Sequence, residues 1–392
     1  MKKTLTVFIA LLILGLIAYF FWPKGGNTPE AGNYPQALPF GESGDTENTA
    51  IEVATIPEGE VAPVFEGTAP IEAPQKLFKI SSEPVAGFVA LERGTSTIIR
   101  FVERATGHVF DSTLPKVEKA RVTNNTIPKI YEAVFREDGS VVVMRHLKNG
   151  GDKIEDLSVA LSGTTTATIL PINTGSLIAG AGDMLIYTNR NNGGIYSSTF
   201  AGSNLRELLS PPFKSWRISR FGKDLLISPR ASFYADGYAY KLSGGALAKM
   251  LGPLKGLATI ASPTGDYLLY SYFDNGMKLY AKELAKNISL EMKPNTLIEK
   301  CVWSKRVREV FFCGAPRDGI GLGEPDLWYQ GKTHFSDYIW SFNLKGDTAY
   351  LILDQRSEYG VDIDIINPSL TQKEDYLVFM NKLDSTLWAI SF

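Results

Sequence analysis

Three observations on this 392-residue sequence predict an all-β fold, specifically a seven-bladed β-propeller. Short apolar runs separated by turns follow one another from about residue 75 to residue 392. They recur with a period of roughly 40 residues, the length of a blade of four short strands. Glycines also stand in the turns after the first runs, where a tight hairpin needs a positive φ: Gly94, Gly139, Gly182, Gly222 and Gly265.

The repeat can be counted at one equivalent position, the second residue of the second strand in each unit. Five of the six steps between these positions are 40 to 44 residues long, and the last is 67. Seven units therefore fit the chain, and rings of six or eight blades fit less well. The positions are Ile98, Val142, Leu185, Leu225, Leu268, Val310 and Leu377.

The first strand of most units has the apolar run expected of a buried inner strand. The run in the sixth unit is the weakest match, because Glu299 and Lys300 interrupt it. The expected inner strands are Val85–Leu91, Tyr131–Phe135, Trp216–Ser219, Leu257–Ala261, Ile298–Trp303 and Val361–Ile366.

The C-terminus ends on a third strand, Trp388–Phe392, which leaves the last blade one strand short. An open edge there would pair with other chains. We expect residues 75–80 (QKLFKI) to complete the last blade and close the propeller domain, 75–392. The alternative is that this segment pairs with the first blade.

Residues 1–24 read as a signal anchor. Leu5–Trp22 contains about eighteen uncharged residues, enough to span a bilayer core of about 30 Å, so contact with the membrane is expected through residues 4–22. Lys2 and Lys3 favour a cytoplasmic N-terminus, which places the propeller in the periplasm or on the cell surface. A cleaved signal peptide is the alternative, but bulky residues stand where its cleavage site needs small ones.

Residues 25–74 form an acidic tether rich in Pro and Gly, with few large apolar residues. Such a segment buries too little surface to offset the entropy of ordering, so we expect a flexible spacer. The whole chain holds 40 basic and 42 acidic residues, which argues against a nucleic-acid surface.

The only two cysteines, Cys301 and Cys313, fall on the first two strands of the sixth unit, roughly opposite each other. A structural disulfide is possible at such a cross-strand pair outside the cytoplasm. Two separately buried thiols are the alternative.

The long step in the count comes from about 25 extra residues between the second and third strands of the sixth unit, Gly314–Asp337. Loops of this length usually serve a function, and exposed Trp, Tyr and Arg dominate binding hot spots. The alternative is that Trp328 and Tyr329 pack on the blade and pin the loop. The candidate binding residues are Arg317, Glu324, Asp326, Trp328, Tyr329 and His334.

No catalytic motif, cofactor motif or metal-ligand spacing is found, and the three histidines stand in different units. Asp362 and Asp364 alternate along the last expected inner strand, so both are expected on one face, where they could line the channel and bind a cation. Alternation at a solvated face explains them equally well.

The turn Ser262–Gly265 (SPTG), the strand Tyr267–Tyr270 and the later Leu279-Tyr280 resemble the repeat of the TolB-type propellers, relatives of the WD-repeat propellers. The motif is clean in this fifth unit only. With the anchor, the tether and Trp328–Trp340, the sequence is similar to uncharacterised membrane-anchored bacterial propellers. The resemblance implies a binding scaffold of the cell envelope and transfers no catalytic residue.

These observations predict a non-enzymatic, membrane-anchored scaffold that binds another envelope or extracellular protein. The alternatives are a glycan or small-molecule binding module at the channel mouth, or a hydrolase that uses carboxylates. An open apolar face would favour the scaffold. A lidded pocket with converging ionisable groups would favour one of the alternatives.

Overall fold

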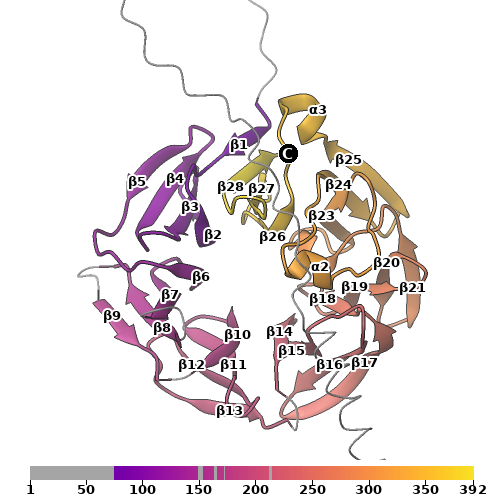
Figure 1. Ribbon diagram of the computed structural model, residues 1–392, viewed down its shortest axis with the longest axis horizontal. Coiled ribbons are helices and arrows are strands. Elements are labelled where there is room, and N and C mark those ends of the chain that lie inside the picture. The colour runs from indigo at the N-terminus through magenta and orange to yellow at the C-terminus, as the bar shows by residue number, and fades with distance from the viewer. Residues whose placement is uncertain (1–74, 149–152, 163–165, 172, 212–213) are drawn as a thin grey trace, which may run out of the picture. The chain divides into compact units, whose positions relative to one another are not determined.

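The computed structural model describes residues 75–392 except 149–152, 163–165, 172 and 212–213. Seven four-stranded antiparallel sheets stand side by side in a ring, as the repeat predicts (Figure 1). The expected anchor (1–24) and tether (25–74) lie outside the described residues. Within the described part, no helix has the length and apolar character needed to cross a membrane.

The strands of each blade are given from the middle of the ring outward. Blade one consists of β2 (Val85–Arg93), β3 (Ser96–Glu103), β4 (Val109–Leu114) and β5 (Glu118–Arg121). Blade two consists of β6 (Ile130–Phe135), β7 (Val141–Lys148), β8 (Lys153–Ala160) and β9 (Thr166–Ile169). Blade three consists of β10 (Thr174–Ala179), β11 (Met184–Asn189), β12 (Ile195–Thr199) and β13 (Arg206–Leu209). Blade four consists of β14 (Trp216–Phe221), β15 (Asp224–Pro229), β16 (Asp236–Ser243) and β17 (Ala246–Lys255).

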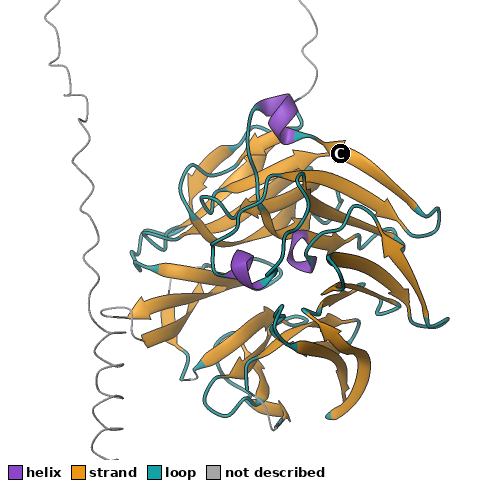
Figure 2. Cartoon of the chain, turned by 45° about the vertical axis from the view of Figure 1, so that its right-hand side comes forward, coloured by secondary structure: helices purple, strands orange, loops and turns teal. Residues whose placement is uncertain are grey.

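Blade five consists of β18 (Ala258–Ala261), β19 (Tyr267–Phe273), β20 (Met277–Glu283) and β21 (Ile288–Met292). Blade six consists of β22 (Cys301–Trp303), β23 (Val310–Pro316), β24 (Asp337–Asn343) and β25 (Thr348–Leu353). Blade seven consists of β26 (Ile365–Leu370), β27 (Tyr376–Asn381), β28 (Leu387–Ser391) and β1 (Leu77–Lys79). Strands make up nearly all of the ring, and the helices are confined to short turns (Figure 2).

The ring is closed by β1, which pairs with β28 in the register Leu77↔Ile390. The strand missing from the last blade is thus supplied from before the first blade. The side chains of Leu77, Phe78 and Ile80 are buried, and Phe78 and Ile80 pack in the apolar cluster shared by blades seven and one. This arrangement covers the edge that β28 would otherwise expose.

The core lies between neighbouring blades, because each sheet packs on another sheet on both faces. Strand β19 shows this directly: its first five residues, Tyr267–Ser271, are all buried instead of alternating. Blades one and two meet most closely at Gly87, where an added Cβ would stand 2.0 Å from the carbonyl oxygen of Ala133. A side chain at that position would push the two blades apart.

Blade six departs from the expected pattern at its inner edge. The predicted strand Ile298–Trp303 is instead a turn of 3-10 helix, η2 (Ile298–Lys300), followed by the short β22. Its charged residues account for this difference, since Glu299 and Lys300 turn toward polar partners described below. Cys301 and Cys313 are register partners in the first two strands and form a disulfide.

The extra residues of blade six connect β23 to β24 and contain the short helix α2 (Asp326–Tyr329). We call residues 317–336 the insertion. In Figure 1, α2 lies on the side of blade six that faces the middle of the ring. A second short helix, α3 (Gln355–Tyr359), follows β25 and ends at Gly360, which has a φ of 67°. The last inner strand, β26, begins at Ile365 and not at Val361 as predicted.

Candidate functional site

The insertion is fixed to the blade by a buried tryptophan. The side chain of Trp328 is 1% exposed, and its indole Nε1 donates to the two carboxylate oxygens of Asp364 at 3.0 and 2.9 Å. The backbone N–H of Trp328 donates to Glu324 Oε2 at 2.8 Å. The ammonium of Lys382 lies 5.0 Å from the centre of the indole ring, and burial lowers the pKa of Lys382. Trp328 therefore pins the loop, as the alternative interpretation of the sequence has it.

Below Trp328 lies a fully buried charge cluster. The Nζ of Lys300 donates to Asp337 Oδ2 at 2.6 Å and, at closer range, to Asp364 Oδ1. The backbone N–H of Ile365 also donates to Asp337 Oδ2, and that of Phe335 to Asp364 Oδ2. A buried charge is costly unless it is paired and hydrogen-bonded, and here one ammonium holds two carboxylates from separate segments. The cluster joins η2, β24, the insertion and the start of β26.

Burial raises the pKa of Asp337 to about 6, with Lys300 opposing this rise and Asp364 adding to it. One oxygen of this carboxylate, Oδ1, is buried and has no hydrogen-bond partner among the described residues. The ionised form of Asp337 is thus less favoured here than it is in water.

Tyr329, the next residue of α2, turns to a different set of partners. Its hydroxyl donates to Glu299 Oε1, and the Nη1 of Arg217 donates to the same carboxylate oxygen at 2.7 Å and to the Tyr329 hydroxyl at 3.3 Å. The guanidinium of Arg230 lies 4.5 Å from the centre of the Tyr329 ring. Burial, and then the Glu299 charge, raise the pKa of Tyr329 well above its usual value, so the hydroxyl stays protonated.

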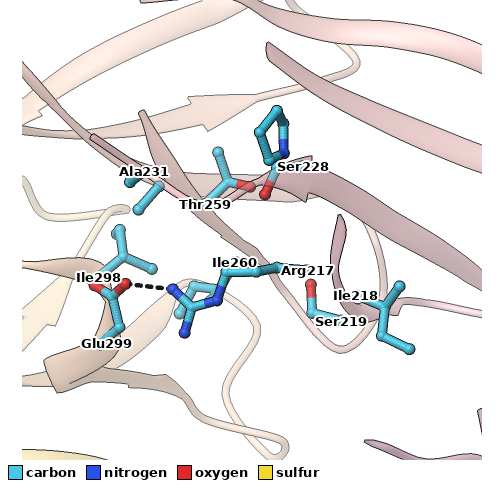
Figure 3. Close-up of a pocket in the computed structure, with 11 residues that line it drawn as sticks. Arg217, Ile218, Ser219, Ser228, Ala231, Thr259, Ile260, Ile298 and Glu299 are labelled. Atoms are coloured by element: carbon cyan, nitrogen blue, oxygen red, sulfur yellow. Dashed lines mark hydrogen bonds and ion pairs between the residues drawn. The ribbon is translucent and has the colours of Figure 1, made fainter. Parts of the chain in front are cut away.

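This group stands at a cavity of about 140 Å³ between the inner strands of blades four and five and η2 of blade six. In Figure 3 the Arg217 guanidinium points toward the Glu299 carboxylate, and the dashed line marks their ion pair. Polar side chains from β14, β15 and β18 also line the cavity: Ser219, Ser228 and Thr259. We call this the central cavity.

Two buried polar atoms of residues that line the central cavity are unsatisfied. Glu299 Oε2 and Thr259 Oγ1 are shielded from solvent and have no hydrogen-bond partner in the part of the chain that the structure describes. The side chain of Glu299 is 11% exposed. Buried polar atoms are nearly always hydrogen-bonded, so two unsatisfied atoms on residues that line one cavity indicate a missing partner.

Of the six candidate residues in the insertion, only Tyr329 reaches the central cavity's edge. Arg317 forms an ion pair with Asp354 and lies over the ring of Tyr338. His334 is exposed.

Glu324 and Asp326, the two acidic residues predicted as binding residues, have different partners in the structure. Glu324 is buried beneath Trp328, whereas Asp326 Oδ2 accepts the backbone N–H of Phe233 at 2.5 Å. Asp326 thus ties the insertion to the loop between β15 and β16 of blade four.

The expectation that Asp362 and Asp364 share a face of a strand is wrong. Both precede β26, where no ladder fixes the pleat, and their environments differ. Asp362 is exposed and accepts a hydrogen bond from Ser336 Oγ at 2.7 Å, while Asp364 is buried against Lys300. Among the described residues, no group of three or more His, Cys, Asp or Glu is placed to hold a metal ion.

The sequence interpretation missed Arg217, Arg230 and Glu299. The sequence contains a signal for two of these residues, because Arg217 and Glu299 are charged residues within the apolar runs predicted as inner strands. A charged residue in an inner strand must find a partner or face the channel. Arg230 follows β15 in a loop, and nothing in its local sequence marks it.

Comparison with known proteins adds the fold and little else. No protein-family model matches the chain, and no curated protein matches it. Among solved structures, one described as "Streptogramin B lyase structure" is similar, with a TM-score of 0.52 and 12% sequence identity, covering 80% of this chain and 97% of that chain. At this identity the likeness supports a β-propeller fold alone. In all, 1114 chains of solved structures match, so the fold alone does not indicate a function.

Proposed function

We propose that this propeller is a binding module that holds a small polar ligand in the central cavity, at the edge of the insertion. The observation that carries this proposal is the pair of unsatisfied buried atoms, Glu299 Oε2 and Thr259 Oγ1, on two residues that line the same cavity. An unsatisfied buried polar group costs roughly 1–3 kcal/mol, and a ligand that hydrogen-bonds to both atoms would recover much of that cost.

The wall of the cavity is preorganised for binding. Glu299 is held in place by Arg217 and by Tyr329, and Tyr329 is positioned in turn by its neighbour Trp328, which Asp364 anchors. A binding group that is already fixed loses little conformational entropy when the ligand arrives. The buried cluster under the insertion therefore supports the site without touching the ligand.

The same geometry favours binding over catalysis. A general acid or base needs a pKa near the operating pH, and the pKa of Tyr329 is far above it. Glu299 Oε1 already accepts two hydrogen bonds. We therefore propose a non-enzymatic role, in which these groups recognise a ligand and do not transfer its protons.

The sequence supports a second proposal, on the place of the module in the cell. We propose that residues 4–22 anchor the chain in the membrane and that the ring is displayed outside the cytoplasm, in keeping with the resemblance to TolB-type envelope propellers. A C-terminal epitope tag tests this: protease added to cells with an opened outer layer should remove the tag, and protection until the inner membrane is lysed would contradict the proposal.

A protein-binding scaffold is the second candidate function, and one observation favours it. Tyr234 and Leu322 are 77% and 74% exposed, and they stand on the two loops that the contact between Phe233 and Asp326 joins. Exposed Tyr is typical of binding hot spots. Deleting the insertion would not separate the candidates, because Trp328 and Glu324 would leave buried partners unpaired.

Saturation-transfer NMR on the full chain in detergent tests the first candidate. The panel consists of neutral, acidic and basic monosaccharides, hydroxy acids and amino acids. We expect at least one compound to bind, and Glu299→Gln to weaken it while the matched control Glu118→Gln, on the exposed strand β5, does not. Failure of the whole panel, or equal binding by both variants, would contradict a ligand site at the central cavity.

A further inference from the structure

The edge of the central cavity holds two arginines, of which one is not in an ion pair in the described part of the chain. Arg217 is neutralised by Glu299 at 2.7 Å. Arg230 is exposed and forms no ion pair with the described residues, and its guanidinium lies against the ring of Tyr329. Asp326, the acidic residue of α2, accepts the backbone N–H of Phe233 and forms no ion pair with Arg230. An anionic group at this edge would therefore meet an uncompensated guanidinium.

The two arginines suit a carboxylate in shape as well as in charge. A guanidinium offers five N–H donors in a planar fork that matches the two oxygens of a carboxylate. Arg230 has all of these donors free of partners among the described residues, and Arg217 uses only Nη1 for Glu299 and Tyr329. The side chain of Arg217 is 48% exposed, so a ligand can reach it from the channel.

The cavity, in contrast, requires a hydrogen-bond donor from the ligand. Glu299 Oε2 can only accept, so it requires an N–H or O–H from the ligand. Thr259 also lines the cavity, and its hydroxyl oxygen Oγ1 can donate or accept a hydrogen bond. The cavity is partly open and has a volume of about 140 Å³, which accommodates part of a small ligand.

We propose that the ligand is a small carboxylate that also bears hydroxyl groups, such as a sugar acid or an open-chain hydroxy acid. Its carboxylate lies between Arg217 and Arg230, and a hydroxyl enters the cavity and donates to Glu299 Oε2. This inference rests on the proposed function and narrows it from polar ligands to hydroxylated carboxylates.

Isothermal titration of the full chain in detergent tests the ligand class with four probes. D-glucuronate is a cyclic sugar acid and D-gluconate is an open-chain acid. D-glucose lacks the carboxylate, and D-glucosamine lacks it too and carries an ammonium group at C2. We expect at least one of the two acids to bind roughly tenfold or more tighter than glucose, and glucosamine to bind weakest. Comparison of the two acids tells a sugar acid from an open-chain acid.

Variants locate the effect. Arg230 is exposed, so Arg230→Gln should leave the fold intact and weaken acid binding roughly tenfold or more without changing glucose binding. Arg230→Lys should give an intermediate loss, because it keeps the charge and loses the planar fork. The control is Arg308→Gln, at an exposed arginine paired with Asp266 away from the cavity.

The outcomes distinguish an error in the ligand class from an error in the proposed binding function. If glucose binds as tightly as the acids, or if Arg230→Gln leaves acid binding unchanged, the ligand class is wrong and the central cavity remains a polar ligand site. If neither acid binds, the ligand class is also wrong. The proposed function falls with it only when the wider NMR panel fails as well.

Discussion

Trp328 donates its indole N–H to Asp364 at 2.9 Å, which joins the insertion to the residue that precedes the inner strand of blade seven. Asp364 holds Lys300 at the same time, and Lys300 follows Glu299 directly in η2. Because Tyr329 is the next residue after Trp328 and contacts Glu299, the same buried cluster positions two groups at the edge of the central cavity.

Replacing Trp328 by Phe removes the indole donor and leaves Asp364 with one partner fewer. We expect the free energy of unfolding to fall by about 1–3 kcal/mol, measured by urea denaturation, and ligand binding to weaken because Tyr329 is no longer held. Trp388→Phe is the matched control, since Trp388 is also buried and its Nε1 donates to Thr386 Oγ1 at 2.7 Å. The control should lose stability and keep binding; equal binding losses in the two variants would refute the positioning role.

Asp337 gives a defined pH dependence. Its pKa is raised from 3.8 in the unfolded chain to about 6 in the folded state. Between these values the folded state binds the proton more readily, so this residue's contribution to folding stability falls as the pH rises from about 4 to about 6, and stays low above that. The difference in unfolding free energy between the wild type and Asp337→Asn, measured from pH 4 to pH 7, should show this slope. A flat difference would show that Asp337 titrates alike in both states.

Thr259→Val should increase stability while it weakens ligand binding. The substitution removes an unsatisfied buried hydroxyl and keeps the shape, so we expect a gain of up to about 1 kcal/mol in the free energy of unfolding. Thr188→Val is the control, because Thr188 is buried and its Oγ1 accepts the backbone N–H of Ser176 at 2.8 Å, which predicts a loss. A loss of stability in Thr259→Val would mean that the hydroxyl has a partner in the free protein.

Ring closure through β1 can be tested by truncation. A chain that begins at residue 75 keeps β1, and one that begins at residue 81 lacks Leu77, Phe78 and Ile80, which are all buried. Each such side chain contributes roughly 1.5–3 kcal/mol when buried, so the shorter chain should lose roughly 5 kcal/mol or more and expose the edge of β28. Thermal melts and light scattering compare the two. Equal stability would show that β1 is dispensable.

The regular features of this protein could be predicted from its sequence because they are local or periodic. The blade count, the inner strands of blades one, two, four and five, and the placement of Cys301 opposite Cys313 follow from spacing alone. The insertion appeared as a break in that spacing. The cavity could not be predicted in this way, because it forms between residues from different blades. Arg217 and Glu299, for example, are 82 residues apart in the sequence.

Two errors have the same physical origin. Both segments were expected to be regular β-strands, in which side chains alternate between the two faces of the sheet. Ile298–Lys300 is instead a 3-10 turn, and Asp362 and Asp364 precede the strand β26. In the folded chain, the need to pair buried Lys300 with carboxylates outweighs strand geometry at both places. Charged residues within an apolar run therefore indicated the proposed site more directly than the composition of the long loop.

The most direct test of the central claim is a high-resolution crystal structure of the full chain soaked with D-glucuronate and with D-gluconate. The account predicts one of these acids in the central cavity, with its carboxylate on Arg230 and a hydroxyl within hydrogen-bond distance of Glu299 Oε2. A cavity that holds only ordered water bonded to Glu299 and Thr259, at concentrations where the ligand saturates the crystal, would contradict it.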